Sequence, residues 1–91
     1  GINNVNNAKN NYFSTFPNPV ENVLNITVSS AVTENAYLTI YNSIGQKVME
    51  QNMEAAIGER TLKLNTELLP AGIYFVELKG SGIKQVAKFY K

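Results

Sequence analysis

The chain contains no cysteine, no histidine, no tryptophan and no aspartate, because all seven of its acidic residues are glutamates. Without cysteine it forms neither a disulfide nor a thiolate zinc site. Without histidine and cysteine, the common activated nucleophiles of hydrolytic enzymes cannot be assembled. Calcium sites usually rely on aspartate, and the glutamates are scattered along the chain. These absences argue against an enzyme, and we expect no catalytic residue, metal ligand or cofactor.

Strong charge and long apolar runs are absent as well. The net charge of +1 is too small for a nucleic-acid binder, which neutralises phosphates with a dense basic face. No apolar run approaches the roughly 20 residues that a membrane-spanning helix needs. The 91 residues suit a single domain. The chain opens on Gly1 without a signal peptide, and we therefore expect a piece of a longer precursor.

The first eleven residues differ in composition from the rest. Six of them are asparagine and few are apolar, so this segment cannot bury enough surface to offset the entropy lost on ordering. We predict that residues 1–11 form a linker to an upstream domain, with a plain terminal tail as the alternative. The folded domain is then expected to span residues 12–91.

The rest of the chain consists of short runs in which polar and apolar residues alternate, separated by turn residues. Alternation with a period of two is typical of strands that bury one face. About seven strands are expected, at residues 12–16, 23–29, 36–41, 47–53, 59–65, 73–79 and 83–91. No helix longer than a single turn is predicted. This spacing predicts an all-β fold, a single antiparallel β-sandwich with an immunoglobulin-like outline.

The longest apolar run covers residues 68–79. Its even-numbered side chains from Tyr74 to Leu78 would face one side and its odd-numbered ones, including Phe75, the other. Apolar groups occupy most positions on both sides, so we predict a central strand covered on both faces. The last strand would pair with it across a tight turn at residues 80–82.

Three local expectations concern single side chains. In the fourth run, Val48 is the clearest inward-facing residue. A short helical turn is expected over residues 66–69, with Thr66 as its cap and Leu68 or Leu69 closing the end of the sandwich.

The tyrosines of the third run, Tyr37 and Tyr41, would point away from the core. We expect them to lie half-buried on the second face of their sheet. A sugar-binding platform that also includes Tyr12 is the alternative.

Four motifs follow one another along the chain. They are a Pro-Asn-Pro corner after Phe16, a hairpin loop with a single glycine, a Gly-x-Tyr strand entry, and a final strand that carries lysines. In this order and spacing they resemble the C-terminal sorting domain, type A, of cargo proteins of the type IX secretion system in Bacteroidota. The resemblance covers roughly residues 12–91. The matching residues are Pro17, Asn18, Pro19, Gly45, Gly72, Tyr74, Lys84, Lys88 and Lys91.

The resemblance implies a function and partners. Domains of this family lie at the C-terminus of exported proteins and direct the cargo, after passage through the periplasm, to an outer-membrane translocon. A sortase-like cysteine peptidase at the cell surface commonly removes the domain, and the cargo is released or attached to lipopolysaccharide. The family fold is an immunoglobulin-like sandwich, as the periodicity predicts independently.

The family motifs also have a purely structural explanation. Prolines and glycines such as Pro17 and Gly45 set backbone geometry, and lysines on an edge strand protect it against aggregation. An exposed edge strand can also accept a partner strand. Our hypothesis is that residues 72–91 form a recognition hairpin, and that cleavage falls within or upstream of residues 3–11. A carbohydrate-binding or adhesion module and a structural spacer are the competing functions.

Overall fold

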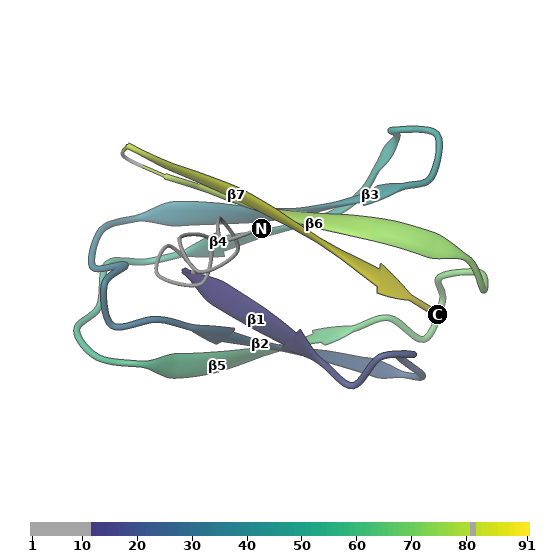
Figure 1. The fold of residues 1–91 in the computed structure, drawn as a ribbon, viewed down its shortest axis with the longest axis horizontal. Coiled ribbons are helices and arrows are strands. Elements are labelled where there is room, and N and C mark those ends of the chain that lie inside the picture. Colours follow the sequence, from purple (N-terminus) through teal and green to yellow (C-terminus); the bar gives the residue numbers. More distant parts are fainter. Residues whose placement is uncertain (1–11, 81) are drawn as a thin grey trace, which may run out of the picture.

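A computed structural model describes residues 12–80 and 82–91, and these form two antiparallel sheets packed face to face (Figure 1). The segment predicted to be a linker, residues 1–11, and position 81 of the last turn lie outside the described residues. The described residues contain seven strands, which confirms the all-β prediction. They are β1 (Phe13–Phe16), β2 (Val23–Val28), β3 (Ala36–Asn42), β4 (Lys47–Met53), β5 (Arg60–Asn65), β6 (Ile73–Gly80) and β7 (Ile83–Tyr90). Among the described residues, no helix is long and apolar enough to cross a membrane.

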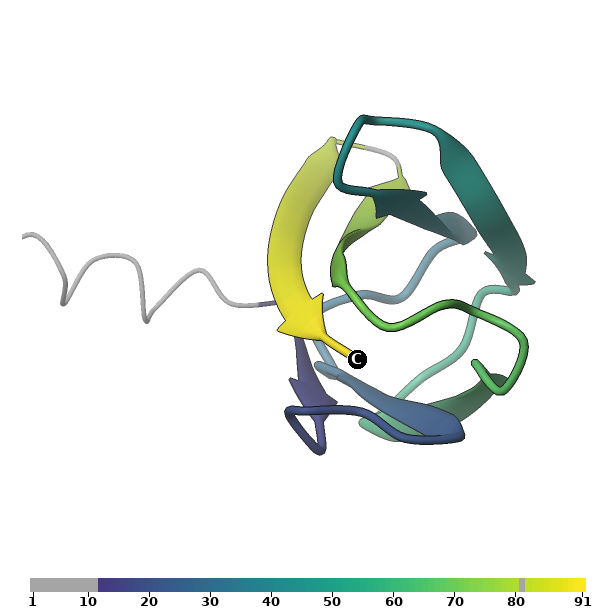
Figure 2. The same ribbon diagram turned by 90° about the vertical axis from the view of Figure 1, so that its right-hand side faces the viewer.

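The strand order is β1-β2-β5 in one sheet and β4-β3-β6-β7 in the other. Strands β2 and β5 therefore share one layer, as strands B and E do in immunoglobulin-like sandwiches. Strands β3, β6 and β7 share the second layer, as strands C, F and G do. Viewed along the strands, the two layers enclose one interior (Figure 2). Strand β1 is an edge of the smaller sheet, and β7 is an edge of the larger sheet.

The interior is filled by alternate residues of both sheets. In β2 the buried and part-exposed positions alternate strictly, as the sequence pattern predicts. Side chains of Leu24, Leu38 and Phe89 are completely buried, and burial of each such side chain contributes about 1.5–3 kcal/mol. The core consists of Phe13, Val20, Leu24, Ile26, Val28, Val32, Ala36, Leu38, Ile40, Met53, Leu64, Tyr74, Val76, Leu78 and Phe89.

The prediction that β6 is covered on both faces is wrong. Its even-numbered residues are buried, but Ile73 is exposed and Phe75 and Glu77 are only half-buried. The strand is central within its sheet, and the described residues form only two layers, so none of them builds a third layer over the outer face. Neighbouring strands shield the apolar groups there from the side, and this partial shelter accounts for the continuous apolar pattern.

The prediction that Val48 is the inward-facing residue of β4 is also wrong. Val48 keeps 37% of its surface exposed, whereas Met49 packs against the core and Met53 is buried. Tyr41 pairs with Lys47 and Ile40 pairs with Met49, so one extra residue, Val48, interrupts the β3–β4 ladder. Such a bulge shifts the alternation by one residue and moves the apolar contacts to the other set of side chains.

Residues 66–69 form a turn rather than a capped helical segment. The N–H of Glu67 donates to Oδ1 of Asn65 at 2.9 Å, so Asn65 rather than Thr66 holds the turn with its side chain. Thr66 is completely buried, and its hydroxyl donates to the carbonyl of Glu21 at 3.3 Å. Of the two candidate leucines, Leu69 packs against the core and Leu68 is 94% exposed.

Candidate functional site: the C-terminal hairpin and its anchors

The last residue of the chain is built into the fold. The N–H of Lys91 donates to the carbonyl of Gly72, and the N–H of Gly72 donates to the carbonyl of Lys91, both at 2.8 Å. The Lys91 ammonium donates to the carbonyl oxygens of Glu67 at 3.2 Å and Leu69 at 2.6 Å. Lys91 therefore ties the end of β7 to the β5–β6 connection, and this role is structural.

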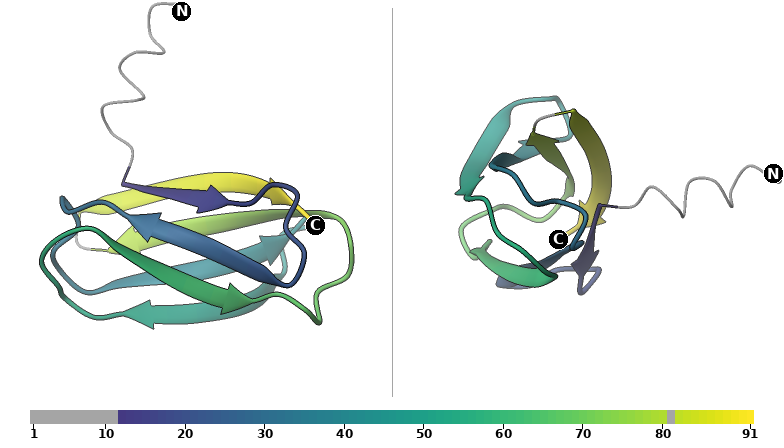
Figure 3. Two further views of the ribbon diagram at one scale, coloured as in Figure 1. Left: turned by 90° about the horizontal axis from the view of Figure 1, so that it is seen from below. Right: turned by 90° about the vertical axis from the view of Figure 1, so that its left-hand side faces the viewer.

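The Pro-Asn-Pro corner holds the same end of β7 from its other side. Oδ1 of Asn18 accepts a hydrogen bond from the N–H of Tyr90 at 3.0 Å, and the N–H of Val20 donates to the carbonyl of Tyr90 at 2.7 Å. Val20 is buried, whereas Pro17 and Pro19 are exposed. Figure 3 shows the connection between β1 and β2 beside the C-terminus. The corner therefore bridges the two sheets at the end of the chain.

Tyr74 joins β6 to β7 within the core. Its ring stacks on Phe89 with centroids 5.4 Å apart and an interplanar angle of 18°. Its hydroxyl donates to the carbonyl of Pro70. A buried tyrosine requires such a partner for its hydroxyl. The Gly-x-Tyr entry thus places one aromatic ring that fixes the start of β6 and the end of β7 together.

Gly45 lies in the β3–β4 hairpin, where its φ of 89° favours glycine. The loop is closed by Asn42, whose Oδ1 accepts hydrogen bonds from the N–H groups of Ile44 and Gln46. Since Asn42 pairs with Tyr74 and Tyr74 with Phe89, this hairpin lies at the same end of the sandwich as the C-terminus. In Figure 1 both lie on the right-hand side.

The structure therefore gathers seven of the nine predicted site residues at one end of the sandwich. These are Pro17, Asn18, Pro19, Gly45, Gly72, Tyr74 and Lys91. The bonds described above give each of Asn18, Gly72, Tyr74 and Lys91 a role in holding the end of β7. The pairing of Asn18 with Tyr90 spans 72 positions, and the only sequence signal for it was the motif itself.

Lys84 and Lys88 lie on the outer face of β7, where both are exposed. Lys84 pairs with Lys79 at the far end of the strand, whereas Lys88 is adjacent to the anchored residues Phe89 and Tyr90. The ammonium of Lys84 lies 3.8 Å from Oε2 of Glu77 in an ion pair. The ammonium of Lys88 lies over the ring of Tyr90, 5.4 Å from its centroid. Within the part of the chain that the structure describes, the ammonium groups of these two lysines contact side chains and solvent, whereas that of Lys91 binds backbone carbonyls.

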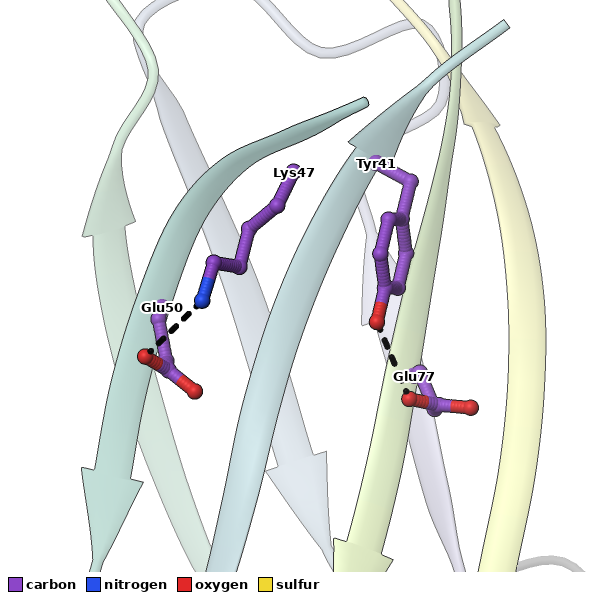
Figure 4. A network of polar contacts seen from close by, with 4 residues as sticks. All are labelled: Tyr41, Lys47, Glu50 and Glu77. Carbon is purple, nitrogen blue, oxygen red and sulfur yellow. Dashed lines mark hydrogen bonds and ion pairs between the residues drawn. The ribbon is translucent and has the colours of Figure 1, made fainter. Parts of the chain in front are cut away.

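The outer face of the larger sheet contains a shallow groove. Tyr41 is half-buried there, as predicted, and its hydroxyl donates to Oε1 of Glu77 at 3.4 Å, while Lys47 pairs with Glu50 at 3.5 Å (Figure 4). Tyr37 keeps 52% of its surface exposed. The groove is lined by Asn35, Tyr37, Thr39, Tyr41, Glu50, Glu77, Lys79 and Gly80.

Tyr12 does not join this groove. It precedes β1 in the smaller sheet, is half-buried against the core, and its N–H donates to Oε1 of Gln85 at 2.7 Å. The three-tyrosine platform considered from the sequence is therefore not assembled.

Within the described part of the chain, no group of three or more metal-ligating side chains exists.

The fold and the anchored hairpin define a small immunoglobulin-like β-sandwich whose C-terminal end is locked by its own loops. A family model described as the secretion system C-terminal sorting domain matches residues 14–91. The chain belongs to this family, and it is a type IX secretion sorting domain. This family is not an enzyme family. No curated protein matches the chain.

Membership in the family identifies the domain as a sorting signal. It acts as a C-terminal signal for secretion, it associates with the type IX secretion machinery and with cargo upstream in the same precursor, and it serves export to the cell surface or the medium.

Proposed function

We propose that this domain is the address that the type IX outer-membrane translocon reads, and that residues 72–91 form the hairpin it contacts. The observation that supports the proposal is that the two faces of β7 differ. Its inward side chain Phe89 is completely buried, while Lys84 and Lys88 on its outer face are exposed. An edge strand that is fixed by the core and open on its other side suits recognition by another protein.

The proposed path follows from this role. The precursor reaches the periplasm, the translocon engages the folded domain, and the cargo passes to the surface of a Bacteroidota cell. A sortase-like cysteine peptidase then removes the domain, and the cargo is released or attached to lipopolysaccharide.

The contacts separate the proposed roles of the nine motif residues. Asn18, Gly72 and Tyr74 make hydrogen bonds that hold the end of β7, so we assign them to folding. Pro17, Pro19, Gly45 and Lys91 are assigned to folding on the same grounds of backbone geometry and backbone contacts. The translocon contact is assigned to Lys84 and Lys88, which are exposed and whose ammonium groups contact the side chains of Glu77 and Tyr90.

The experiment is secretion of a reporter fused upstream of the chain in a bacterium with a type IX system. Replacing Lys84 and Lys88 together by alanine should lower secretion several-fold. A matched control replaces Lys47 and Lys63, which are exposed lysines of β4 and β5, and should secrete normally. Equal secretion by both double variants would contradict the assignment of the lysines.

Deletion of residues 83–91 is the coarser version of this test. Since Phe89 is fully buried and stacks on Tyr74, the deletion removes part of the core and we expect misfolding. Loss of secretion then says little about recognition. Full secretion by a folded deletion variant would refute the hypothesis that the translocon contacts the hairpin. The substitutions on the outer face are therefore the more informative variants.

Cleavage is proposed within or upstream of residues 3–11, because a peptidase requires accessible extended chain. The first described strand begins at Phe13, so a cut upstream leaves the sandwich whole. Mass spectrometry of the mature cargo's C-terminus identifies the site. A cut between Val23 and Val28, inside β2, would contradict this domain layout.

The groove on the outer face favours a second candidate, a carbohydrate-binding module. Exposed Tyr37 offers an aromatic face, and Glu50 and Glu77 offer acceptors for sugar hydroxyls. A glycan array with the purified chain tests it, with Tyr37→Ala as the variant. Binding that depends on Tyr37, without secretion of the reporter, would favour the module. A response in neither assay would favour a structural spacer.

A further inference from the structure

The pairing of β6 with β7 determines which backbone groups of β7 remain open. Gly72 and Lys91 exchange both of their hydrogen bonds, so they form a hydrogen-bonded pair of the antiparallel ladder. Such pairs recur at every second residue, and the register of β6 and β7 has no shift over its whole length. The N–H and C=O groups of Lys84, Val86, Lys88 and Tyr90 therefore point away from β6.

Tyr90 provides a check on this assignment. Its N–H donates to Asn18 and its carbonyl accepts from Val20, both outside β6. The corner thus already occupies the last position of the open edge. Among the described residues, no hydrogen bond is made by the outward backbone groups of Lys84, Val86 or Lys88. Tyr12 approaches β7, but it donates to the side chain of Gln85.

The open edge carries a defined charge pattern. Lys84 and Lys88 flank Val86 on the same face of the strand, and all three are exposed. Pairing of two copies centred on Val86 would place Lys84 opposite Lys88. Like charges directly opposite each other destabilise a strand pair, so this register disfavours a second copy. A strand with carboxylates at the two lysine positions is complementary to the edge.

We propose that the edge of β7 from Lys84 to Lys88 accepts one extended strand of a partner protein, with a carboxylate opposite each lysine and an apolar residue opposite Val86. The motif is acidic-x-apolar-x-acidic, and its symmetry suits either strand direction. The Pro-Asn-Pro corner ends the added strand before Tyr90. This inference rests on the proposed function, because it names how the hairpin would be read.

The probe is a nine-residue peptide, Thr-Thr-Glu-Thr-Val-Thr-Glu-Thr-Thr, blocked at both ends, titrated into the full chain labelled with nitrogen-15. In saturating peptide, amide exchange should slow about tenfold or more at Lys84, Val86 and Lys88. Replacing both glutamates of the peptide by glutamine should weaken binding roughly two- to thirtyfold. Equal binding of the two peptides, or protection at β4 instead of β7, overturns the proposal.

A backbone variant separates strand addition from simple charge attraction. Val86→Pro removes an N–H that points away from β6, which a proline on an edge strand tolerates. It should abolish the protection at Lys84 and Lys88, while Val86→Thr, which keeps the N–H, should retain it. Unchanged core signals of Phe89 and Leu38 report that both variants fold. Binding by folded Val86→Pro equal to that of Val86→Thr overturns strand addition.

Two measurements without peptide identify other occupants. Exchange at Val86 that slows as the protein concentration rises would mean that a second copy pairs with the edge. Protection of Val86 at high dilution would mean that another part of this chain covers it. Either result overturns an external partner strand.

The reporter assay keeps this inference distinct from the proposed function. If replacement of Lys84 and Lys88 lowers secretion and Val86→Pro does not, the hairpin is read through its side chains and strand addition fails alone. If neither change matters while the unaltered domain directs secretion, the hairpin is not the contact. If the unaltered domain does not direct secretion, the proposed function itself fails.

Discussion

The four-stranded sheet ends in β4 on one side and in β7 on the other, and both edges carry lysine on the face that points to solvent. Strand β7 pairs with its neighbour over eight positions without a shift, whereas β4 is interrupted by a bulge after its first residue. The end of β7 is held by Asn18, Val20 and Gly72. Strand β4 begins in a hairpin loop closed by Asn42.

This difference shows two ways of managing an exposed edge. A bulge disrupts the regular ladder and makes an edge a poor template for another strand. Lysines leave the ladder intact but repel a second copy and select a partner of opposite charge. Strand β4 uses the first device and carries a mixed pair, Lys47 and Glu50. Strand β7 uses the second, so it remains a regular edge.

The largest expected effect separates the two edges by their contribution to the core. Phe89→Ala in β7 should lower the free energy of unfolding by about 3–5 kcal/mol, because it empties a completely buried site. Met49→Ala in β4 should cost about 1–2 kcal/mol, since that side chain is only partly buried. Urea unfolding followed by circular dichroism measures both. Phe89→Leu gives a measurable value if the alanine variant is unfolded, and equal losses at the two edges would contradict the comparison.

The next effect concerns the hairpin that leads into β4. Gly45→Ala should lower the free energy of unfolding by about 1–2 kcal/mol. The φ of 89° lies in the left-handed region, where the Cβ of an L-residue comes too close to its own carbonyl oxygen. No other atom lies within 4 Å of the position that this Cβ would take, so the cost is conformational rather than a clash. Gly45→Asn should lose less, since asparagine visits this region more readily. Thermal unfolding of the two variants checks the order, and full stability of Gly45→Ala would exclude a role for the glycine.

The smallest expected effect tests the anchor on β7. Asn18→Ala should lower the free energy of unfolding by about 0.5–1.5 kcal/mol, because it removes the acceptor of the Tyr90 N–H. Asn52→Ala, at an exposed position of β4, should stay within about 0.5 kcal/mol. Hydrogen exchange at the Tyr90 amide should quicken in Asn18→Ala and stay slow in Asn18→Asp, which keeps an acceptor oxygen. An unchanged exchange rate of the Tyr90 amide in Asn18→Ala would show that the Pro-Asn-Pro corner does not hold the end of β7.

The strands could be predicted because each of them has a local signal. In β2 the alternation of Leu24 with Asn25 identifies the buried face without knowledge of the partner strand. In β6 the apolar run located the strand but not its exposed face, because Ile73 and Phe75 continue the apolar pattern on the outer side. The same reasoning failed for Val48, because a bulge depends on how two strands meet and leaves no local mark. The turn at Thr66 failed for a related reason: its hydroxyl donates to Glu21, which lies far away in the sequence.

The motif residues could be located from the sequence, but their roles could not. Pro17 and Pro19 predict a corner, because proline restricts its own backbone and that of the preceding residue. That this corner meets Tyr90, at the other end of the chain, requires the two sheets to be packed. The pattern also placed Lys84, Lys88 and Lys91 in one group, whereas the structure separates two solvent-facing lysines from one that binds backbone carbonyls.

The sequence by itself determined that this chain makes short strands, which side of most of them is buried, and that it lacks the side chains of common catalytic and metal sites. These properties depend on period-two patterning and composition, which are local. Only the tertiary structure decided that seven motif residues meet at one end and that β7 is a regular, open edge. Strand order, bulges and cross-sheet hydrogen bonds join residues far apart in the chain, and their energies exist only once both sheets have formed.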